Sequence, residues 1–264
     1  MIDTDQVEIE EARNEEPAVG LSPEDLLTLQ EMAELGLLFG FSKSRTHPKM
    51  KPFIHSTRSG VEIINLEQTI RLLKVAAAFL REIVTGGKTI LFVGTAPASK
   101  TAVKEIAEKL GQPYVTERWF GGTLTNFKVF SARIEKFNRL REEKEKGGLD
   151  KYTKKERLMI DREMEKMEIF LGGVRKMKGL PAALVVIDSE KHKTTVREAK
   201  KINIPVVAVL NTNANPEMIN YPIPANDRNP KSIAWVLNYL LAEIEKANQP
   251  EEERPAEKQE QPAE

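Results

Sequence analysis

The fold is decided by the stretch AALVVIDSEKHKTTVREAKKINIPVVAVL, residues 182–210. Its two ends, 182–188 and 205–210, are short apolar runs rich in β-branched residues, which is typical of buried strands. The charged segment between them, about 192–202, has the length of a short helix. A strand, a helix and a second strand in this order predict two parallel neighbours in one sheet, with the helix on a face of that sheet.

The same alternation continues in both directions from this unit. Upstream, the sequence predicts a strand at 88–94, a helix over 98–110 and a short strand at 113–115. Downstream, a helix over 230–247 ends the pattern. We therefore predict an α/β domain built on a doubly wound parallel sheet, with helices on both faces.

Two helices are predicted before this alternation. The first is capped by Ser22 and stopped by Gly36. The second is capped by Asn65 and runs to about Val84, with Gln68 at the position that completes a capping box. Both caps follow from short polar side chains, which accept hydrogen bonds from the free N–H groups of a first turn.

Residues 41–60, between these helices, are predicted to be an irregular basic loop, followed by a short strand, VEIIN, at 61–65. The loop has two prolines and no apolar period, and His47 and His55 in it have no metal-ligand spacing. A solvated or phosphate-contacting role is expected for both histidines. The loop contains no acid and five cations, which are candidate RNA-binding residues: Lys43, Arg45, Lys49, Lys51 and Arg58.

Residues 125–178 interrupt the strand–helix rhythm and are predicted to form an inserted antiparallel helical hairpin. Thr123 or Thr125 is expected to cap its first helix, and Thr153 with Glu156 forms a capping box for the second. Each helix carries one apolar seam, as in a coiled coil. The seam residues are Phe127, Phe130, Ile134, Phe137 and Leu140 on the first helix, and Ile160, Met164, Met167 and Leu171 on the second.

The stretch ERWFGGTLTNFKVF, residues 117–130, joins this insertion to the domain. Arg118, Lys128 and Arg133 add three candidate RNA-binding cations near the joint. Trp119 and Phe120 admit two interpretations, either core packing under the hairpin or stacking on an unpaired base, and both can hold together.

Charge and composition bound the class of protein. The 264 residues have zero net charge, but residues 1–20 carry seven acids against one arginine, and residues 250–264 carry six acids against two cations. The body between the two tails is therefore basic, which favours a polyanionic partner. We predict acidic disordered extensions at 1–20 and 248–264, an α/β domain over 21–124 and 179–247, and the hairpin over 125–178.

The sequence excludes several classes of site. Without cysteine there is no disulfide, thiolate metal site or cysteine nucleophile. The first residues resemble neither a secretion signal nor a transit peptide, and no apolar run is long enough for a membrane span. We expect a cytoplasmic protein with no membrane partner and with no catalytic residue, cofactor or metal.

The nearest approach to an active site is GTAPASKT, residues 94–101, which follows a strand and opens a helix. It matches a phosphate-binding P-loop except that Ser99 replaces the second glycine, and Pro97 removes one N–H from the loop. An ordinary strand-to-helix turn is favoured. The alternative, a degenerate nucleotide-binding enzyme, would use Lys100, Thr101 and Asp188. An RNA-binding module is the third hypothesis.

An ordered series of motifs carries a resemblance to a known family. They are LGLLFG (35–40), HPKMKPFI (47–54), ILFVGT (90–95), RWFGGTLTNFK (118–128), YTKKE (152–156), LGGVRKMKGLPAALVVID (171–188), EAKKINIPVVAVLNTN (198–213) and YPIPANDR (221–228). Together they cover about residues 26–246 in the order of that family. The chain closely resembles the second protein of the small ribosomal subunit, in its bacterial form.

This resemblance implies a Rossmann-like parallel sheet with an inserted helical hairpin, and a ribosome-bound, non-enzymatic component that supports translation. It also implies the partners, which are small-subunit ribosomal RNA and neighbouring ribosomal proteins, including the large messenger-binding protein numbered one. Three of the places where the sequence departs from the family bear on a metal site. Phe41 follows Gly40 where the family usually has a histidine, and the family's D-T-N and N-D-D-A-I become NTN (211–213) and NDRNP (226–230). A metal held by relatives at those positions is therefore not expected here.

Overall fold

The computed structural model describes residues 23–246, and the predicted cap Ser22 and both acidic extensions lie outside the described residues. Its core is a five-stranded sheet of order β5-β4-β6-β7-β8 in which every neighbouring pair is parallel. The strands are β4 (Ile90–Val93), β5 (Tyr114–Val115), β6 (Ala183–Ile187), β7 (Val206–Leu210) and β8 (Tyr221–Pro224). The predicted parallel sheet is thus confirmed.

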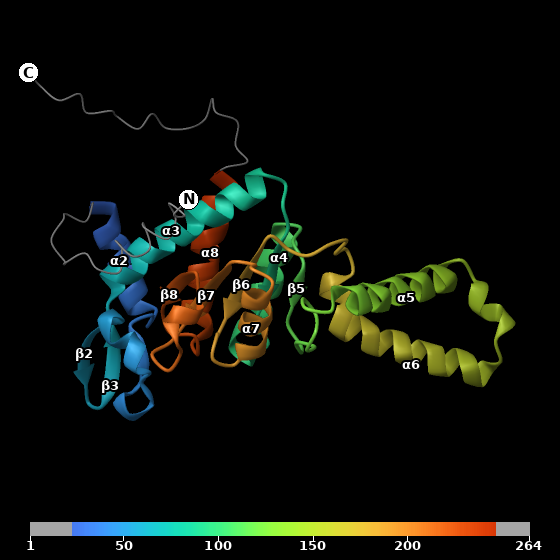
Figure 1. Cartoon of the computed structure of the whole chain (residues 1–264), viewed down its shortest axis with the longest axis horizontal. Helices are drawn as coiled ribbons and strands as arrows, with labels where there is room; N and C mark the ends of the chain where they lie inside the picture. The colour runs from blue at the N-terminus through green and yellow to red at the C-terminus, as the bar shows by residue number, and fades with distance from the viewer. Residues whose placement is uncertain (1–22, 247–264) are drawn as a thin grey trace, which may run out of the picture.

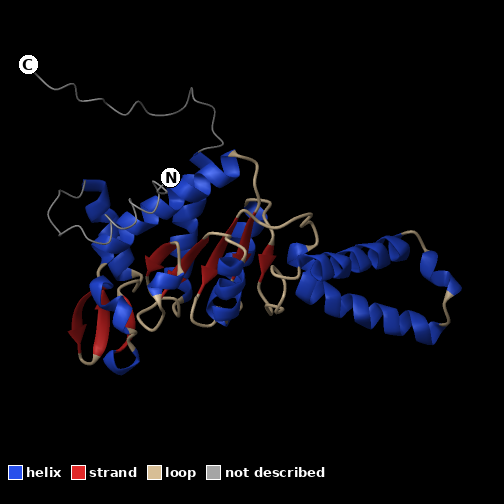
Figure 2. Ribbon diagram, viewed as in Figure 1, coloured by secondary structure: helices blue, strands red, loops and turns tan. Residues whose placement is uncertain are grey.

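Helices cover both faces of this sheet, as Figure 2 shows. The α-helices of the described residues, not all of which lie on the sheet, are α2 (Pro23–Glu34), α3 (Leu66–Thr85), α4 (Pro97–Lys109), α5 (Phe127–Glu145), α6 (Lys154–Leu171), α7 (Lys193–Lys201) and α8 (Pro230–Lys246). Successive strand residues point to opposite faces, so Val185 and Val207 belong to one core and Val186 and Ala208 to the other. This architecture is consistent with a Rossmann-like fold.

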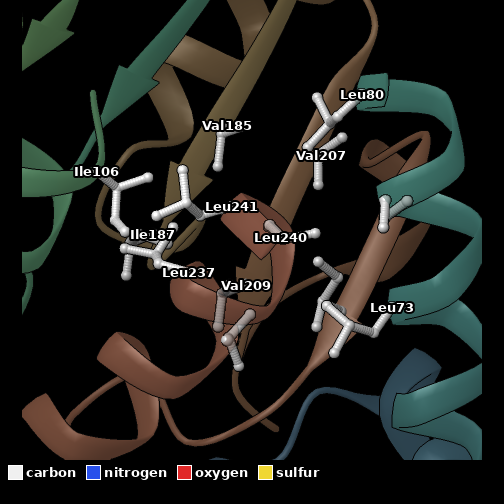
Figure 3. Close-up of a cluster of buried hydrophobic side chains, with 14 of the residues drawn as sticks. Leu73, Leu80, Ile106, Val185, Ile187, Val207, Val209, Leu237, Leu240 and Leu241 are labelled. Atoms are coloured by element: carbon white, nitrogen blue, oxygen red, sulfur yellow. The ribbon is translucent and has the colours of Figure 1, made fainter. Parts of the chain in front are cut away.

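The first core lies between the sheet and α3, α4 and α8 (Figure 3). Leu73 and Leu80 of α3 meet Leu237 and Leu240 of α8 over the strand residues, and all four leucines are buried. Burying a leucine stabilises the fold by about 1.5–3 kcal/mol relative to leaving it exposed. The apolar faces of these helices therefore fix them on the sheet and hold its carboxyl edge in place.

Strand β8 was not predicted, because Pro222 and Pro224 discourage a strand assignment. It is the edge strand beside β7, with Ala208 opposite Pro222 and Leu210 opposite Pro224. An edge strand tolerates proline since a missing N–H on its outer side breaks no ladder bond.

A second, smaller sheet corrects the prediction for residues 41–60. Strands β1 (Phe39–Ser42), β3 (Val61–Ile64) and β2 (Ile54–Arg58) pair antiparallel in that order. The short helices η1 (Lys43–Arg45) and η2 (Pro48–Phe53) connect β1 to β2. The prediction of an irregular loop was wrong. Strands β1 and β2 are short and their side chains are half-exposed or exposed, so the sequence shows no alternation of apolar and polar residues there.

The small sheet is held against the end of β7. Phe41 N donates to Thr212 Oγ1 at 2.9 Å, and His47 N donates to the Thr212 carbonyl oxygen at 2.8 Å. A Cβ atom on Gly40 would lie 2.6 Å from Thr212 Cγ2, so only glycine allows this close approach. The basic residues of the small sheet are thereby placed on a fixed support.

Helices α5 and α6 extend away from both sheets (Figure 1). They are joined through η3 (Gly148–Lys151), and ion pairs link Lys136 to Glu163 and Lys144 to Asp161, both at 2.6 Å. The predicted capping box of α6 is confirmed, since Glu156 N donates to Thr153 Oγ1 and Thr153 N donates to Glu156 Oε2. The apolar contact is uneven along the pair: Phe130, Ile134 and Phe137 are buried, whereas Ile160, Met164 and Met167 are half-buried.

Two predicted caps need correction. Asn65 caps α3 through Glu67 N and Gln68 N, but Gln68 Oε1 is buried with no hydrogen-bond partner among residues 23–246, so the capping box is incomplete. Helix α5 begins after Asn126 and has no side-chain cap. Thr123 and Thr125 do not cap it, because their hydroxyl groups donate to the Phe120 carbonyl and to Glu198.

Candidate nucleic-acid interface

The eight predicted RNA-binding cations are all exposed, and the structure divides them into two groups. The small-sheet cations are Lys43, Arg45, Lys49, Lys51 and Arg58, carried by η1, η2 and the end of β2. The helix-pair cations are Arg118, Lys128 and Arg133, carried by the segment before α5 and by α5 itself. Figure 1 places β2 and α5 on opposite sides of the large sheet, so one compact site cannot contain both groups.

Within the small-sheet group, aromatic and ionic contacts orient individual side chains. The Arg45 guanidinium lies 4.9 Å from the centre of the Phe41 ring, and Arg228 lies 5.4 Å from the same ring. Lys49 Nζ pairs with Glu217 at 2.6 Å, but both side chains are more than half exposed, so the pair contributes little. His47 Nδ1 accepts from Lys49 N at 3.2 Å and caps η2.

The helix-pair cations depend on a buried carboxylate that the sequence did not single out. Glu198 of α7 is 8% exposed and accepts five hydrogen bonds from residues 119–125. Its donors include Trp119 Nε1 at 3.1 Å, Gly122 N at 2.9 Å and Leu124 N at 3.1 Å. With five hydrogen bonds to one side chain, Glu198 fixes the loop that leads into α5.

The two aromatic residues of the loop pack against the protein. Trp119 and Phe120 are half-buried and contact the second core, and the Phe120 ring meets Phe170 of α6 edge-on at 5.7 Å. The packing interpretation therefore accounts for both rings. Stacking on RNA is not needed to explain why they are present.

A second buried acidic group lies at the carboxyl end of the sheet. Asp188 follows β6 with φ of 65°, Asp227 follows β8, and both are fully buried. Arg228 Nη2 lies 3.3 Å from Asp188 Oδ2, and Arg228 Nε lies 3.6 Å from Asp227 Oδ1. Asn211 Nδ2 also donates to Asp227 Oδ1, at 3.2 Å.

These contacts bring the three family departures together, because Phe41, Asn211 and Arg228 all meet at this place. The guanidinium supplies the positive charge that faces the two carboxylates. Burial, reinforced by the neighbouring Asp188 charge, raises the pKa of Asp227 to about 7. Among residues 23–246, no group of three His, Asp or Glu side chains has the arrangement needed to hold a metal ion.

His192 is the only buried histidine among the described residues. Its Nδ1 lies 2.9 Å from the Asp188 carbonyl oxygen, and its Nε2 lies 3.1 Å from Thr95 Oγ1. Burial lowers the pKa of His192, so the neutral ring is favoured. The ring thus ties the turn after β6 to the turn after β4.

The turn at 94–101 does not form a phosphate cradle. Only residues 94–96 separate β4 from α4, and Ser99 is already inside the helix, with its Oγ donating to the Ala96 carbonyl. Lys100 pairs with Glu117 at 2.6 Å instead of pointing into a loop. The ordinary strand-to-helix turn is the correct interpretation.

Glu198 could not be found from the sequence, because its neighbours Arg197, Lys200 and Lys201 make α7 look like a solvated charged helix. Its burial follows from the position of α7 over the sheet, next to Val196 and Ala199 of the second core.

Within the described part of the chain, no helix is both long and apolar enough to cross a membrane.

Comparison with known proteins gives one consistent result. The family model described as Ribosomal protein S2 matches residues 32–247. A protein of Nitratiruptor sp. named small ribosomal subunit protein uS2 is 46% identical over 208 residues, covering 79% of this chain and 78% of that protein. Proteins with the same name from Coprothermobacter proteolyticus and Nocardia farcinica are 43% and 40% identical over 219 residues, covering 83% of this chain and 82% and 77% of theirs.

Proposed function

The chain belongs to the ribosomal protein S2 family, and from this premise we propose that its two cationic groups bind separate parts of the small-subunit ribosomal RNA. As a member of that family, it is a structural component of the small ribosomal subunit and not an enzyme. The observation that carries the RNA proposal is that the eight predicted cations are all exposed and form two separate groups, one on η1, η2 and β2 and the other on α5 and the segment before it.

Two distant groups suit a protein that bridges folded RNA. Each exposed Lys or Arg that neutralises a phosphate releases counterions, which gives affinity without reading sequence. The small-sheet cations rest on a sheet tied to Thr212, and the helix-pair cations rest on a loop tied to Glu198. The backbone that carries each group is therefore ordered before the RNA binds, which lowers the entropic cost of binding.

The proposed domain organisation follows from the same division. Residues 21–124 and 179–247 form the α/β body, and residues 125–178 act as an inserted antiparallel helical hairpin. The ion pairs between Lys136 and Glu163 and between Lys144 and Asp161 support this assignment. The acidic segments 1–20 and 248–264 lie outside the described residues and lower the net charge of the chain.

Neighbouring ribosomal proteins are the second class of proposed partner, with the large messenger-binding protein numbered one among them. Exposed apolar side chains on α6 support a protein contact, since Leu158, Met159 and Ile169 are each more than half exposed. The proposed location is the cytoplasm, on the ribosome.

Removing two small-sheet cations tests the RNA contact. Lys49→Ala combined with Lys51→Ala should weaken binding to small-subunit ribosomal RNA and lower the slope of log affinity against log salt by at most about two, because two phosphate contacts are lost. Filter binding over a salt series measures both quantities. The matched control is Lys104→Ala with Lys109→Ala on α4, which also removes two exposed charges.

The control pair should leave the slope unchanged. An equal loss in both double variants would indicate a general effect of net charge, and an unchanged slope in the Lys49 and Lys51 variant would remove η2 from the RNA-contacting surface.

A further inference from the structure

A hollow of about 330 Å³ opens beside the small sheet, between η1, η2 and β2. The residues lining it include Lys43, Lys51, Pro48, Ile54, Thr57 and Glu62. It is far larger than one water molecule requires, so it has room for a planar heterocycle. Two of the small-sheet cations thus belong to the wall of a concave site and do not lie on a flat surface.

Glu62 is the unusual member of this wall. It is 4% exposed, it lies opposite Thr57 in the β2–β3 ladder, and Thr57 Oγ1 donates to Glu62 Oε2 at 2.7 Å. Within residues 23–246, no ion pair joins Glu62 to a lysine or arginine. A carboxylate accepts about four hydrogen bonds, and a buried one is costly unless donors meet it. The Glu62 side chain can therefore accept further hydrogen bonds from a molecule bound in the hollow.

The rest of the wall limits what that molecule is. Pro48 and Ile54 are apolar and suit the face of a ring, whereas the exposed ammonium groups of Lys43 and Lys51 suit an attached phosphate. The ligand therefore combines flat apolar faces, N–H donors on one edge and phosphate. A nucleotide of single-stranded RNA has all three.

The donor pattern selects one base. Guanine presents two adjacent donors on its Watson–Crick edge, the N1–H and the N2 amino group, which match the two oxygens of a carboxylate. Adenine offers one amino group beside an acceptor nitrogen, and the single N–H of uracil lies between two carbonyl oxygens that a carboxylate repels. Cytosine offers one amino group beside an acceptor nitrogen.

We propose that this hollow binds an unpaired guanine of RNA, with Glu62 accepting from its Watson–Crick edge and with Lys43 and Lys51 contacting the flanking phosphates. This inference rests on the proposed RNA-binding function and deepens it, since it adds a base-reading site to a surface otherwise expected to bind backbone. Bases are read specifically where they are unstacked and splayed out, so the target is a loop or a bulge.

The test uses the full chain and three labelled oligoribonucleotides, UUUGUUU, UUUAUUU and UUUIUUU, where I is inosine. Fluorescence anisotropy at low salt should show that the guanine oligomer binds about tenfold more tightly than the adenine one, as for a bidentate base contact. Inosine lacks the N2 amino group, so its affinity should fall between the two. This arm needs no substitution and cannot be confused with misfolding.

Substitutions then separate base reading from charge. Glu62→Gln should remove most of the preference for guanine, because its amide N–H₂ faces a donor of the base. Lys51→Ala should weaken both oligomers by a similar factor and leave their ratio unchanged. Equal binding of the guanine and adenine oligomers by the unaltered protein, or an undiminished preference in Glu62→Gln, would overturn the proposal.

Sedimentation with small ribosomal subunits, measured in parallel, distinguishes this inference from the function on which it rests. If the protein joins subunits but binds the guanine and adenine oligomers equally, the ribosomal role is supported and the guanine site is ruled out. A protein that prefers guanine but never joins subunits keeps the site and loses the ribosomal role.

Discussion

Glu198→Ala is expected to lower the free energy of unfolding by about 3–5 kcal/mol. This is the largest loss expected for any buried polar residue described above. The carboxylate accepts from Trp119, Gly122, Leu124 and Thr125, and alanine leaves the buried Leu124 N and the partly buried other donors without this acceptor. Each hydrogen bond to a charged group contributes about 1.5–3 kcal/mol, but the contributions overlap because the donors share one acceptor. Urea denaturation followed by circular dichroism measures the change.

Two further variants sharpen this result. Glu198→Gln keeps one acceptor oxygen and should cost about half as much, whereas Glu105→Ala removes an exposed carboxylate of α4 and should change stability by less than about 0.5 kcal/mol. A cost below about 1 kcal/mol for Glu198→Ala would show that the loop at 119–125 is held by other contacts. The weakened loop should also reduce RNA affinity, because Arg118 and Lys128 lose their fixed positions.

Asp227→Asn is expected to remove a pH dependence of stability. The pKa of Asp227 is raised to about 7 in the folded protein, compared with about 3.9 when unfolded. The folded state therefore holds this proton between these two values and the unfolded state does not, so stability falls as pH rises from about 4 to 7 and then levels off. The difference in pKa corresponds to about 4 kcal/mol over the whole window.

The asparagine variant should thus be more stable than the unaltered protein at pH 8, and the advantage should vanish near pH 4. Urea denaturation at a series of pH values gives both curves, and subtracting them isolates the contribution of residue 227. If the stabilities of the two proteins changed in parallel with pH, the raised pKa of Asp227 would be contradicted. Asp161→Asn on α6, where the carboxylate pairs with Lys144 on the surface, is a suitable control.

Sequence reasoning recovered the parts of the fold that rest on local patterns. The strands at 182–188 and 205–210 and the helix between them are present within one or two residues at each end. Apolar β-branched runs and a charged interval are enough to define a parallel unit, because burial on both faces leaves few other arrangements. The cap of α3 by Asn65 follows from local chemistry in the same way.

The features that sequence reasoning missed depend on contacts between distant segments. The pairing of β1 and β2 with β3, the strand β8 and the five hydrogen bonds to Glu198 each join residues whose neighbours give no sign of the contact. Asp188, Asn211 and Asp227 are similar, since each follows a different strand and they meet only at the carboxyl edge of the finished sheet. The motif at 118–128 was recognised, but its support lies 73 to 79 residues away.

The central claim is that the chain is a structural part of the small ribosomal subunit, and sucrose-gradient fractionation tests it most directly. A lysate of cells that make the chain is sedimented at moderate salt, and the fractions are probed for the protein. The account predicts that the protein sediments with the small subunits and with complete ribosomes. Recovery only at the top of the gradient, with intact subunits lower down, would contradict it.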